Sequence, residues 1–588
     1  MKQFFKTMFA SALGGLLAIG LVIIIAIFTI MGMAVSFGHS PEYVPKSNTV
    51  FKLSLSGNLQ ETATENPFSF LSFGEAVQSL SIKDIIKSIR IAKNNDNVKG
   101  IYLQAGALSA GTTGIEMIRR ELTDFKASGK FIVAYGDSYA QGCYYLCSVA
   151  DKMFLNPLGA LDIHGLVSET TFYKGIYNKL GVEFEVFKVG TYKGAVERYM
   201  LDRLSDENRE QITSYQQGIW RNITDGMAGS RNLTPKDINN FADQGYMLSS
   251  AEKTVELGFI DELKYKADAE EYVKELAGQT GDKLKTTGLS KMKNVKEPLQ
   301  AASDQIAVLY AEGEIMNEAA ADIYGSKLIT EKMAEELAGL RRDENVKAVV
   351  LRVNSPGGSA YISEQIWKEV TELKKVKPVV VSMSDVAASG GYYISCAASK
   401  IIAEHNTITG SIGVFSVIPN AAGLYRKLDI TTDVVKTNTY GDMFDLSRQP
   451  RDDEKRIMQA YTEHIYDLFL TRCADGRGKT KEEINEIAQG RVWTGEQALE
   501  RGLVDALGGL DDAVAAAAGL AGLDEYRIRH ISDDRDLLQG FFAKQLEDLK
   551  ISLIKSFIGE EYKYLKALNN IKHNTDIQAR LLYDAQPL

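Results

Sequence analysis

The sequence is poor in the residue types that build disulfide scaffolds and metal sites. Its 588 residues include four cysteines, with no C-x-x-C pair, and six scattered histidines without an H-E-x-x-H pattern. A disulfide-rich scaffold is therefore excluded, and we predict no metal site. The 67 basic and 77 acidic residues give a net charge of −10, which argues against nucleic-acid binding. A composition of 45% apolar and 24% charged residues excludes a mostly disordered chain and a polytopic membrane protein.

Charge is absent from one long stretch near the N-terminus. No Asp, Glu, Lys, Arg or His occurs from Thr7 to Gly38, and about 20 apolar residues suffice to span a bilayer as a helix. Lys2 and Lys6 precede the stretch, so the positive-inside rule predicts a cytoplasmic N-terminus and an extracytoplasmic (periplasmic) remainder. We predict a single-pass anchor of the cell inner membrane within residues 1–46. The alternative is a cleaved signal peptide, whose apolar region is normally only about 7–15 residues long.

The rest of the chain is an internal duplication. A shift of 248 positions brings two long stretches into register without a gap, from Val98 to Lys193 in the first copy. VKGIYL (98–103) then aligns with VKAVVL (346–351). A shift near 245 pairs GYMLSSAEKTVELGFIDEL, which begins at Gly245, with GRVWTGEQALERGLVDALG, which begins at Gly490. Such sustained register indicates a tandem repeat of one domain.

Each copy alternates short β-branched runs with helical stretches of 10–15 residues. This rhythm is typical of βαβ units and predicts an α/β fold. Lys-rich, weakly apolar sequence over 280–300 is typical of a linker, and LLQGFFAKQLEDLKISLIKSFI near the C-terminus has helical spacing. The predicted units are residues 1–46 (cytoplasmic N-terminus and transmembrane anchor), 47–297 (first repeat), 298–532 (second repeat) and 533–588 (helical C-terminal extension).

The two copies differ most at turns where chemistry is expected. The second copy has NSPGGS at 354–359, where paired glycines Gly357 and Gly358 let a backbone approach a ligand closely and favour developing negative charge. The first copy has GALSAG there, and a merely structural turn is the alternative.

AASGGYY (387–393) places Ser389 on a strand-to-helix turn, which resembles the geometry of a nucleophile elbow. Its counterpart in the first copy is Gln141, which cannot be a nucleophile, although a structural role for Ser389 stays open.

A nucleophilic serine needs a base. His405 lies after the following strand-like run and is one alternative. The other is Lys193 in GTYKGAVE of the first copy, provided that burial or a neighbouring charge lowers its pKa. Gly441 occupies the equivalent position of the second copy. Each copy therefore keeps one half of a possible Ser–Lys pair, whereas an exposed surface lysine is the ordinary alternative.

Four motifs in order, GTYKGAVE, NSPGGS, AASGGYYIS and TGSIGV (409–414), resemble the long tandem form of the signal peptide peptidase SppA (protease IV) family. The resemblance covers nearly everything after the anchor. It implies a ClpP/crotonase-like fold and a serine protease with Ser389 as nucleophile and Lys193 as general base. It further implies that Ser411 orients the lysine and that Gly390, with Gly357 or Gly358, binds the oxyanion. Arg198-Tyr199 departs from the Pro-Phe that relatives often carry beside the lysine loop.

The resemblance also implies the substrates and the assembly. It predicts a membrane-anchored endopeptidase that cleaves hydrophobic peptides such as remnant signal peptides, that forms a homotetramer and that uses no cofactor. Two other classes stay open. Crotonase-type folds bind acyl-CoA through oxyanion glycines, so an acyl-transfer or hydratase enzyme is one alternative, and a non-catalytic membrane scaffold is the other.

Overall fold

The computed structural model describes most of the chain that follows the apolar N-terminal stretch. In this part no helix is long and apolar enough to cross a membrane. The predicted anchor lies outside the described residues, apart from two glycines within it. The described residues are 14–15, 42–62, 79–296, 302–317, 327–531 and 578–580.

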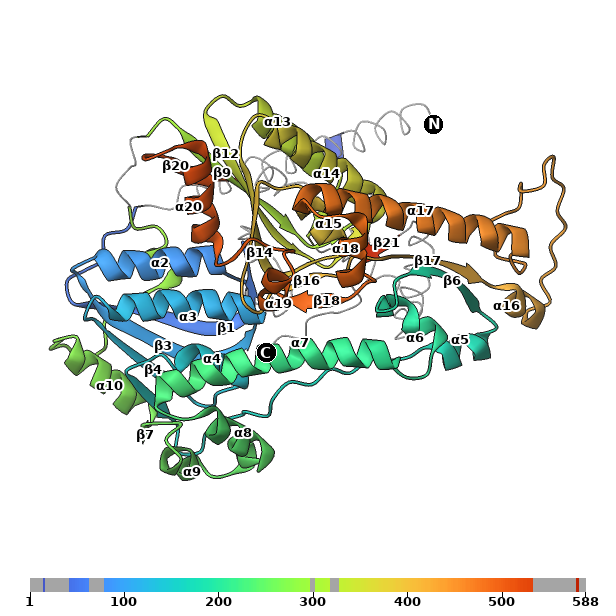
Figure 1. Cartoon of the computed structure of the whole chain (residues 1–588). Coiled ribbons are helices and arrows are strands. Elements are labelled where there is room, and N and C mark those ends of the chain that lie inside the picture. The colour runs from blue at the N-terminus through green and yellow to red at the C-terminus, as the bar shows by residue number, and fades with distance from the viewer. Residues whose placement is uncertain are drawn as a thin grey trace, which may run out of the picture.

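The first repeat is built around a parallel sheet that is buried on both faces (Figure 1). Its elements are β1 (Thr49–Gln60), β2 (Ser79–Ser81), α2 (Ile82–Asn94), β3 (Val98–Ser109), α3 (Thr112–Lys126), β4 (Phe131–Gly136), α4 (Gln141–Cys147), β5 (Lys152–Leu155), β7 (Glu262–Leu263), α10 (Lys266–Leu276) and β8 (Thr286–Gly288). The strand order is β2-β1-β3-β4-β5-β7, with β8 also paired to β1. Phe51 of β1 faces the apolar layer of α2, α3 and α4, whereas Val50 faces that of α10. Alternate residues thus enter opposite layers, as the period of a strand requires.

The second repeat repeats this architecture. Its elements are β9 (Gln305–Glu312), α13 (Lys332–Arg342), β12 (Val346–Ser355), α14 (Ala360–Lys374), β14 (Val379–Ala388), α15 (Gly390–Ser395), β15 (Lys400–Ala403), β16 (Ile408–Gly410), β18 (Val492–Thr494), α19 (Gly495–Glu500), β19 (Ala506–Leu507), α20 (Leu510–Ala521) and β20 (Arg527–Ile531). The strand order is β18-β16-β14-β12-β9-β20. Helices α13, α14 and α15 bury one face of the sheet, and α20 buries the other.

The elements of the two repeats coincide at the shift found in the sequence. Residues 112–126 form α3 and residues 360–374 form α14, which is a shift of 248 at both ends. Strands β5 and β15 are related by the same shift. The predicted α/β class and tandem duplication are therefore confirmed.

A third sheet joins the two repeats. Its elements are β6 (Glu183–Val189), β10 (Glu314–Ile315), β11 (Leu328–Ile329), β13 (Gly357–Ser359), β17 (Val414–Asn420) and β21 (Gln578–Arg580). Strand β6 of the first repeat pairs antiparallel with β17 of the second, with Val189 opposite Val414. The chain that leaves β6 therefore lies beside the chain that enters β17, which brings the GTYKGAVE and TGSIGV motifs together.

Two helices of 26 residues each also cross between the repeats (Figure 1). Helix α7 (Asp206–Arg231) of the first repeat contacts β18, and α17 (Asp452–Arg477) of the second contacts β6. Val386, Ala388 and Val492 of the second repeat belong to the apolar core of the first. The remaining described elements are α5 (Lys174–Leu180), η2 (Gly194–Val196), α6 (Glu197–Met200), α8 (Pro235–Asp243), η3 (Tyr246–Leu248), α9 (Ala251–Glu256), α11 (Leu289–Met292), α16 (Ala422–Lys427) and α18 (Lys481–Ile487).

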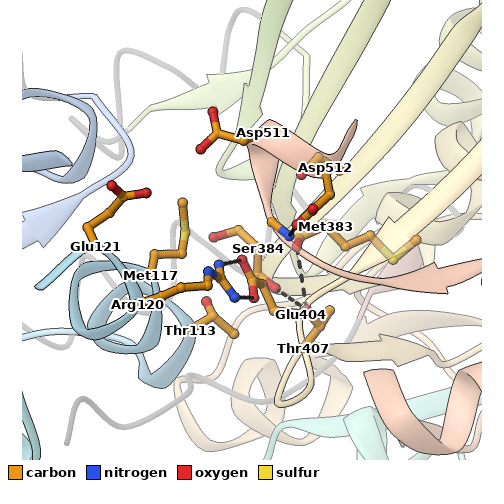
Figure 2. Close-up of polar contacts among 12 residues, drawn as sticks. Thr113, Met117, Arg120, Glu121, Met383, Ser384, Glu404, Thr407, Asp511 and Asp512 are labelled. Atoms are coloured by element: carbon orange, nitrogen blue, oxygen red, sulfur yellow. Dashed lines mark hydrogen bonds and ion pairs between the residues drawn. The ribbon is translucent and has the colours of Figure 1, made fainter. Parts of the chain in front are cut away.

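Polar side chains cross the same interface in defined pairs. Figure 2 shows Arg120 of α3 directed at Glu404, which follows β15. The guanidinium donates to both carboxylate oxygens, at 3.1 and 2.9 Å. The Glu404 side chain is fully buried, whereas that of Arg120 is 46% exposed. This bidentate ion pair fixes the relative orientation of the repeats more narrowly than apolar contact alone.

One sequence prediction needs correction. Residues 280–300 are not a simple linker, because Thr286–Gly288 forms β8 in the first sheet and α11 follows it. The predicted helical extension, residues 533–588, lies outside the described residues except for 578–580, which form β21, and it stays a prediction. Both short segments are held by backbone pairing, which leaves no periodic apolar pattern in the sequence.

Candidate active site

Ser389 stands at a sharp turn between a strand and a helix. Strand β14 ends at Ala388 and α15 begins at Gly390, which leaves Ser389 with φ 57° and ψ −113°. A side chain other than glycine rarely adopts a positive φ, and such strain is typical of functional sites. The Ser389 amide donates to the Gly410 carbonyl at 2.8 Å, which holds the turn in place. The Ser389 side chain is fully buried.

Lys193 reaches this serine from the other repeat. It lies four residues after the end of β6 and is 1% exposed. Its Nζ lies 2.7 Å from Ser389 Oγ, and 3.0 and 3.1 Å from the carbonyl oxygen and Oγ of Ser411. Burial lowers the pKa of Lys193 well below its ordinary value. Desolvation disfavours the ammonium form, so the site favours the neutral amine.

The three contacts of Nζ match the hydrogen-bonding capacity of a neutral amine. An NH₂ group has two hydrogens and one lone pair. The two hydrogens can be donated to the carbonyl and hydroxyl oxygens of Ser411, which lie 3.0 and 3.1 Å from Nζ. The lone pair is then free to accept the hydroxyl proton of Ser389. This arrangement satisfies every polar group of the amine without a charged partner.

Ser411 occupies the turn between β16 and β17. Its φ of 50° is again positive, and its amide donates to the Arg491 carbonyl at 2.7 Å. The side chain is buried. Ser411 precedes β17, and Lys193 follows β6. Because β17 pairs with β6, one sheet sets the positions of both residues.

The predicted oxyanion glycines lie on neighbouring elements. Gly390 is the first residue of α15, and Gly357 and Gly358 lie in β13, which α15 contacts. Gly357 and Gly358 have φ of 96° and 154°, so their conformations suit residues without a Cβ. The Gly357 amide donates to Ser355 Oγ at 3.1 Å, so this donor is already engaged.

Strand β21 shows how an extended segment lies on this edge. It pairs antiparallel with β13, with Gly357 opposite Arg580 and Gly358 opposite Ala579. Gln578 also pairs with Phe415 of β17. The gap between β13 and β17 therefore has the width of one extended strand.

The remaining sequence candidates lie elsewhere or have other partners. Gln141, the counterpart of Ser389, is buried and accepts from the amides of His164 and Gly165 at 3.1 and 2.9 Å. Gly441, the counterpart of Lys193, is exposed. His405 is exposed, and no hydrogen bond joins it to Ser389 among the described residues.

Sequence reasoning missed the segment of residues 489–492. Its backbone forms hydrogen bonds with both the loop that carries Lys193 and the turn that carries Ser411. The one available signal was the alignment of Gly490 with Gly245, which did not by itself point to the site. No group of three or more His, Cys, Asp or Glu side chains suited to a metal ion occurs in the part of the chain that the structure describes.

Comparison with known proteins places the chain in a family. The model of peptidase family S49 matches residues 124–280 and 371–524. The chain is 33% identical to the chloroplastic serine protease SPPA of Arabidopsis thaliana, over 85% of this chain and 74% of that protein. It is 36% identical to Protease 4 of Salmonella typhi, over 80% of this chain and 76% of that protein. Protease 4 of Haemophilus influenzae is 33% identical, over 87% and 83%.

These matches define the enzyme as a serine protease. It belongs to peptidase family S49 and carries two copies of the family's domain. The acyl-CoA enzyme and the non-catalytic scaffold are thereby set aside. Among solved structures, a mutant of ClpP1 from Listeria monocytogenes matches 35% of this chain and 94% of its own, at 16% identity and a TM-score of 0.24. A score this low carries no conclusion about function.

Proposed function

We propose that the protein is a membrane-anchored endopeptidase in which Ser389 is the nucleophile and Lys193 the general base. The observation that carries the proposal is the 2.7 Å separation of Lys193 Nζ and Ser389 Oγ in a buried site. A base must lie within hydrogen-bond reach of the proton that it abstracts, and its pKa must be near the working pH. A lysine amine beside the serine hydroxyl meets the first condition, and burial shifts its pKa downward, in the direction that the second condition requires.

The chemistry proceeds through an acyl-enzyme. Ser389 Oγ bonds to the peptide carbonyl carbon while its proton passes to Lys193 Nζ. The resulting ammonium donates that proton to the leaving amine as the C–N bond breaks. A water molecule then attacks the ester, again giving a proton to Lys193, and Ser389 recovers its proton as it leaves. Ser411 keeps the amine aimed at the serine through its carbonyl and hydroxyl.

Backbone amides stabilise the oxyanion in this proposal. The Gly390 amide stands at the start of α15, next to the nucleophile. The second donor is Gly357 or Gly358 of β13: the Gly357 amide donates to Ser355 Oγ, and Gly358 lies opposite both Ile315 of β10 and Ala579 of β21. Preorganised amides of this kind typically contribute about 10²–10³-fold to the rate each.

The proposed substrates are hydrophobic peptides in extended form, including remnant signal peptides. The pairing of β21 with β13 supports an extended substrate, whose backbone would take the place of β21 on this edge. The uncharged stretch from Thr7 to Gly38 supports a membrane anchor, with the catalytic repeats on the extracytoplasmic side. A homotetramer stays part of the proposal through the family resemblance alone.

Alanine variants of the full-length protein test the proposal. Ser389→Ala and Lys193→Ala should each lower kcat on a fluorogenic hydrophobic peptide by about 10³-fold or more, with unchanged melting temperature. Gln141→Ala is the matched control, because it alters the equivalent buried position of the first repeat. It should retain activity within about twofold of the unaltered enzyme. Substantial activity in Lys193→Ala would remove the lysine from the mechanism and return attention to His405.

A further inference from the structure

The segment Gln489–Val492 touches the lysine loop through its backbone. The Tyr192 amide, one residue before the lysine, donates to the Gln489 carbonyl at 2.8 Å. Gly490 lies so close that a Cβ atom there would stand 2.7 Å from both the Cβ and the backbone nitrogen of Lys193. Carbon atoms in ordinary contact are about 3.5–4.0 Å apart, so only glycine fits without a shift.

The same segment touches the Ser411 turn on its other side. The Gly490 amide donates to the Ile412 carbonyl at 2.8 Å, and the Arg491 carbonyl accepts from the Ser411 amide at 2.7 Å. A Cβ atom on Gly413 would stand 2.8 Å from the Gly490 Cα. The backbone of Gly490 is thus held between the two loops that supply Lys193 and Ser411.

One buried side chain ties this arrangement to α7. Gln211 donates through Nε2 to the Tyr192 carbonyl at 2.9 Å and accepts at Oε1 from the Val492 amide at 3.0 Å. It also donates to Asn208, and it is 5% exposed. Gln211 therefore bridges the residue before the lysine and the start of β18, which belong to different repeats.

We propose that the Gln489–Val492 segment is a positioning element that fixes Lys193 Nζ relative to Ser389 across the two repeats. It contains no group that contacts the reacting atoms in the described structure, and it acts through the two loops on either side of it. The inference rests on the proposed Ser–Lys mechanism and adds to it the element that sets the distance between base and nucleophile.

The internal duplication supplies a matched control. Gly245 is the counterpart of Gly490 at the shift of 245, and the two residues have similar φ of 66° and 77°. Alanine strains the backbone comparably at both positions. At Gly245, however, nothing lies within 4 Å of a Cβ atom, whereas at Gly490 the added methyl meets Lys193.

The experiment compares Gly490→Ala with Gly245→Ala in the full-length enzyme, by kcat, KM and the pH midpoint of kcat. Displacement of a catalytic group by about 1 Å can cost about 100-fold, so Gly490→Ala should lose at least tenfold in kcat, with KM within about twofold. Its pH midpoint should move upward, because a displaced amine is less completely desolvated. Gly245→Ala should keep the kcat and midpoint of the unaltered enzyme. Equal kcat and equal midpoints for the two variants would overturn the proposal.

A second variant decides the matter if Gly490→Ala does not fold. Gln211→Met has similar volume but cannot bridge Tyr192 and Val492, so it should lower kcat and raise the pH midpoint in the same way. An unchanged midpoint in a folded Gln211→Met protein would count against positioning. Failure of this inference is distinct from failure of the mechanism, because the mechanism fails only if Lys193→Ala itself stays active.

Discussion

At the scale of single residues, the proposed site depends on an amine that is shielded from solvent. Lys193 is 1% exposed, and burial is the cause that lowers its pKa. Ser389 and Ser411 give the neutral amine a full set of hydrogen bonds, so it needs no carboxylate nearby. A carboxylate at the site would favour the ammonium form and work against a general base.

This electrostatic state predicts the pH dependence of activity. The neutral fraction of Lys193 grows as pH rises through its pKa, so kcat/KM should rise with pH and reach a plateau. Because burial lowers that pKa, the midpoint should fall well below the ordinary lysine value of about 10.4. Rates between pH 5 and pH 10, with melting temperature followed in parallel, measure the midpoint. A rise confined to pH near 10 would show that the base is not desolvated.

At the scale of elements, helix α3 presents the buried carboxyl group of Glu116 to the second repeat. Burial, and then the neighbouring carboxyl groups of Glu404 and Asp385, raise the pKa of Glu116 to about 8 against the opposing effect of Arg120 and Arg119. The Nδ2 of Asn406 donates to its carboxyl oxygen. The Glu116 carboxyl group, at the contact between α3 and the second repeat, is therefore mostly protonated at neutral pH.

That proton makes stability depend on pH. In the unfolded chain Glu116 ionises near pH 4.3, whereas in the folded protein it ionises near pH 8. Its contribution to the free energy of unfolding is present below about pH 4 and is lost as pH rises to about 8. Glu116→Gln keeps the acceptor for Asn406 and removes this loss, so its urea midpoint should gain on the unaltered protein between pH 5 and pH 9. Glu344 is exposed, so Glu344→Gln should show no such gain in urea midpoint. A gain equal to that of Glu116→Gln would contradict the account.

The elements also show what a sequence can and cannot predict. Strands such as β12 and helices such as α14 were predictable, because core elements keep their apolar pattern in both copies. The pairing of β6 with β17 was not, since antiparallel contact between distant segments depends on tertiary structure rather than on local spacing. Ser389 and Lys193 were predicted from their reciprocal loss in the two copies. The Gln489–Val492 segment acts through backbone groups, which leave little trace in side-chain identity.

At the scale of the whole molecule, the proposed site lies between the repeats. Ser389 and Lys193 are 196 positions apart in the chain, yet their side chains are hydrogen-bonded. Within each repeat the two equivalent positions are 52 residues apart, at 141 and 193 and at 389 and 441. A covalent tether between the repeats gives the two halves a high effective concentration, so each copy could lose the half that it no longer used.

A site formed within one chain predicts the outcome of mixing inactive variants. Ser389→Ala and Lys193→Ala proteins, mixed under conditions of subunit exchange, should regain no activity, because neither chain holds both groups. Mixing each with unaltered enzyme provides the control that exchange does not inactivate an intact site. Recovery of a sizeable fraction would mean that different chains contribute the serine and the lysine.

The most direct measurement of the central claim is the site and rate of covalent labelling by a fluorophosphonate. The account predicts one modified residue, Ser389, identified by peptide mass spectrometry in the full-length protein. In Lys193→Ala the labelling rate should fall by about 10³-fold or more, because the hydroxyl has lost its base. Modification of a different serine, or labelling of Lys193→Ala at the rate of the unaltered enzyme, would contradict the account.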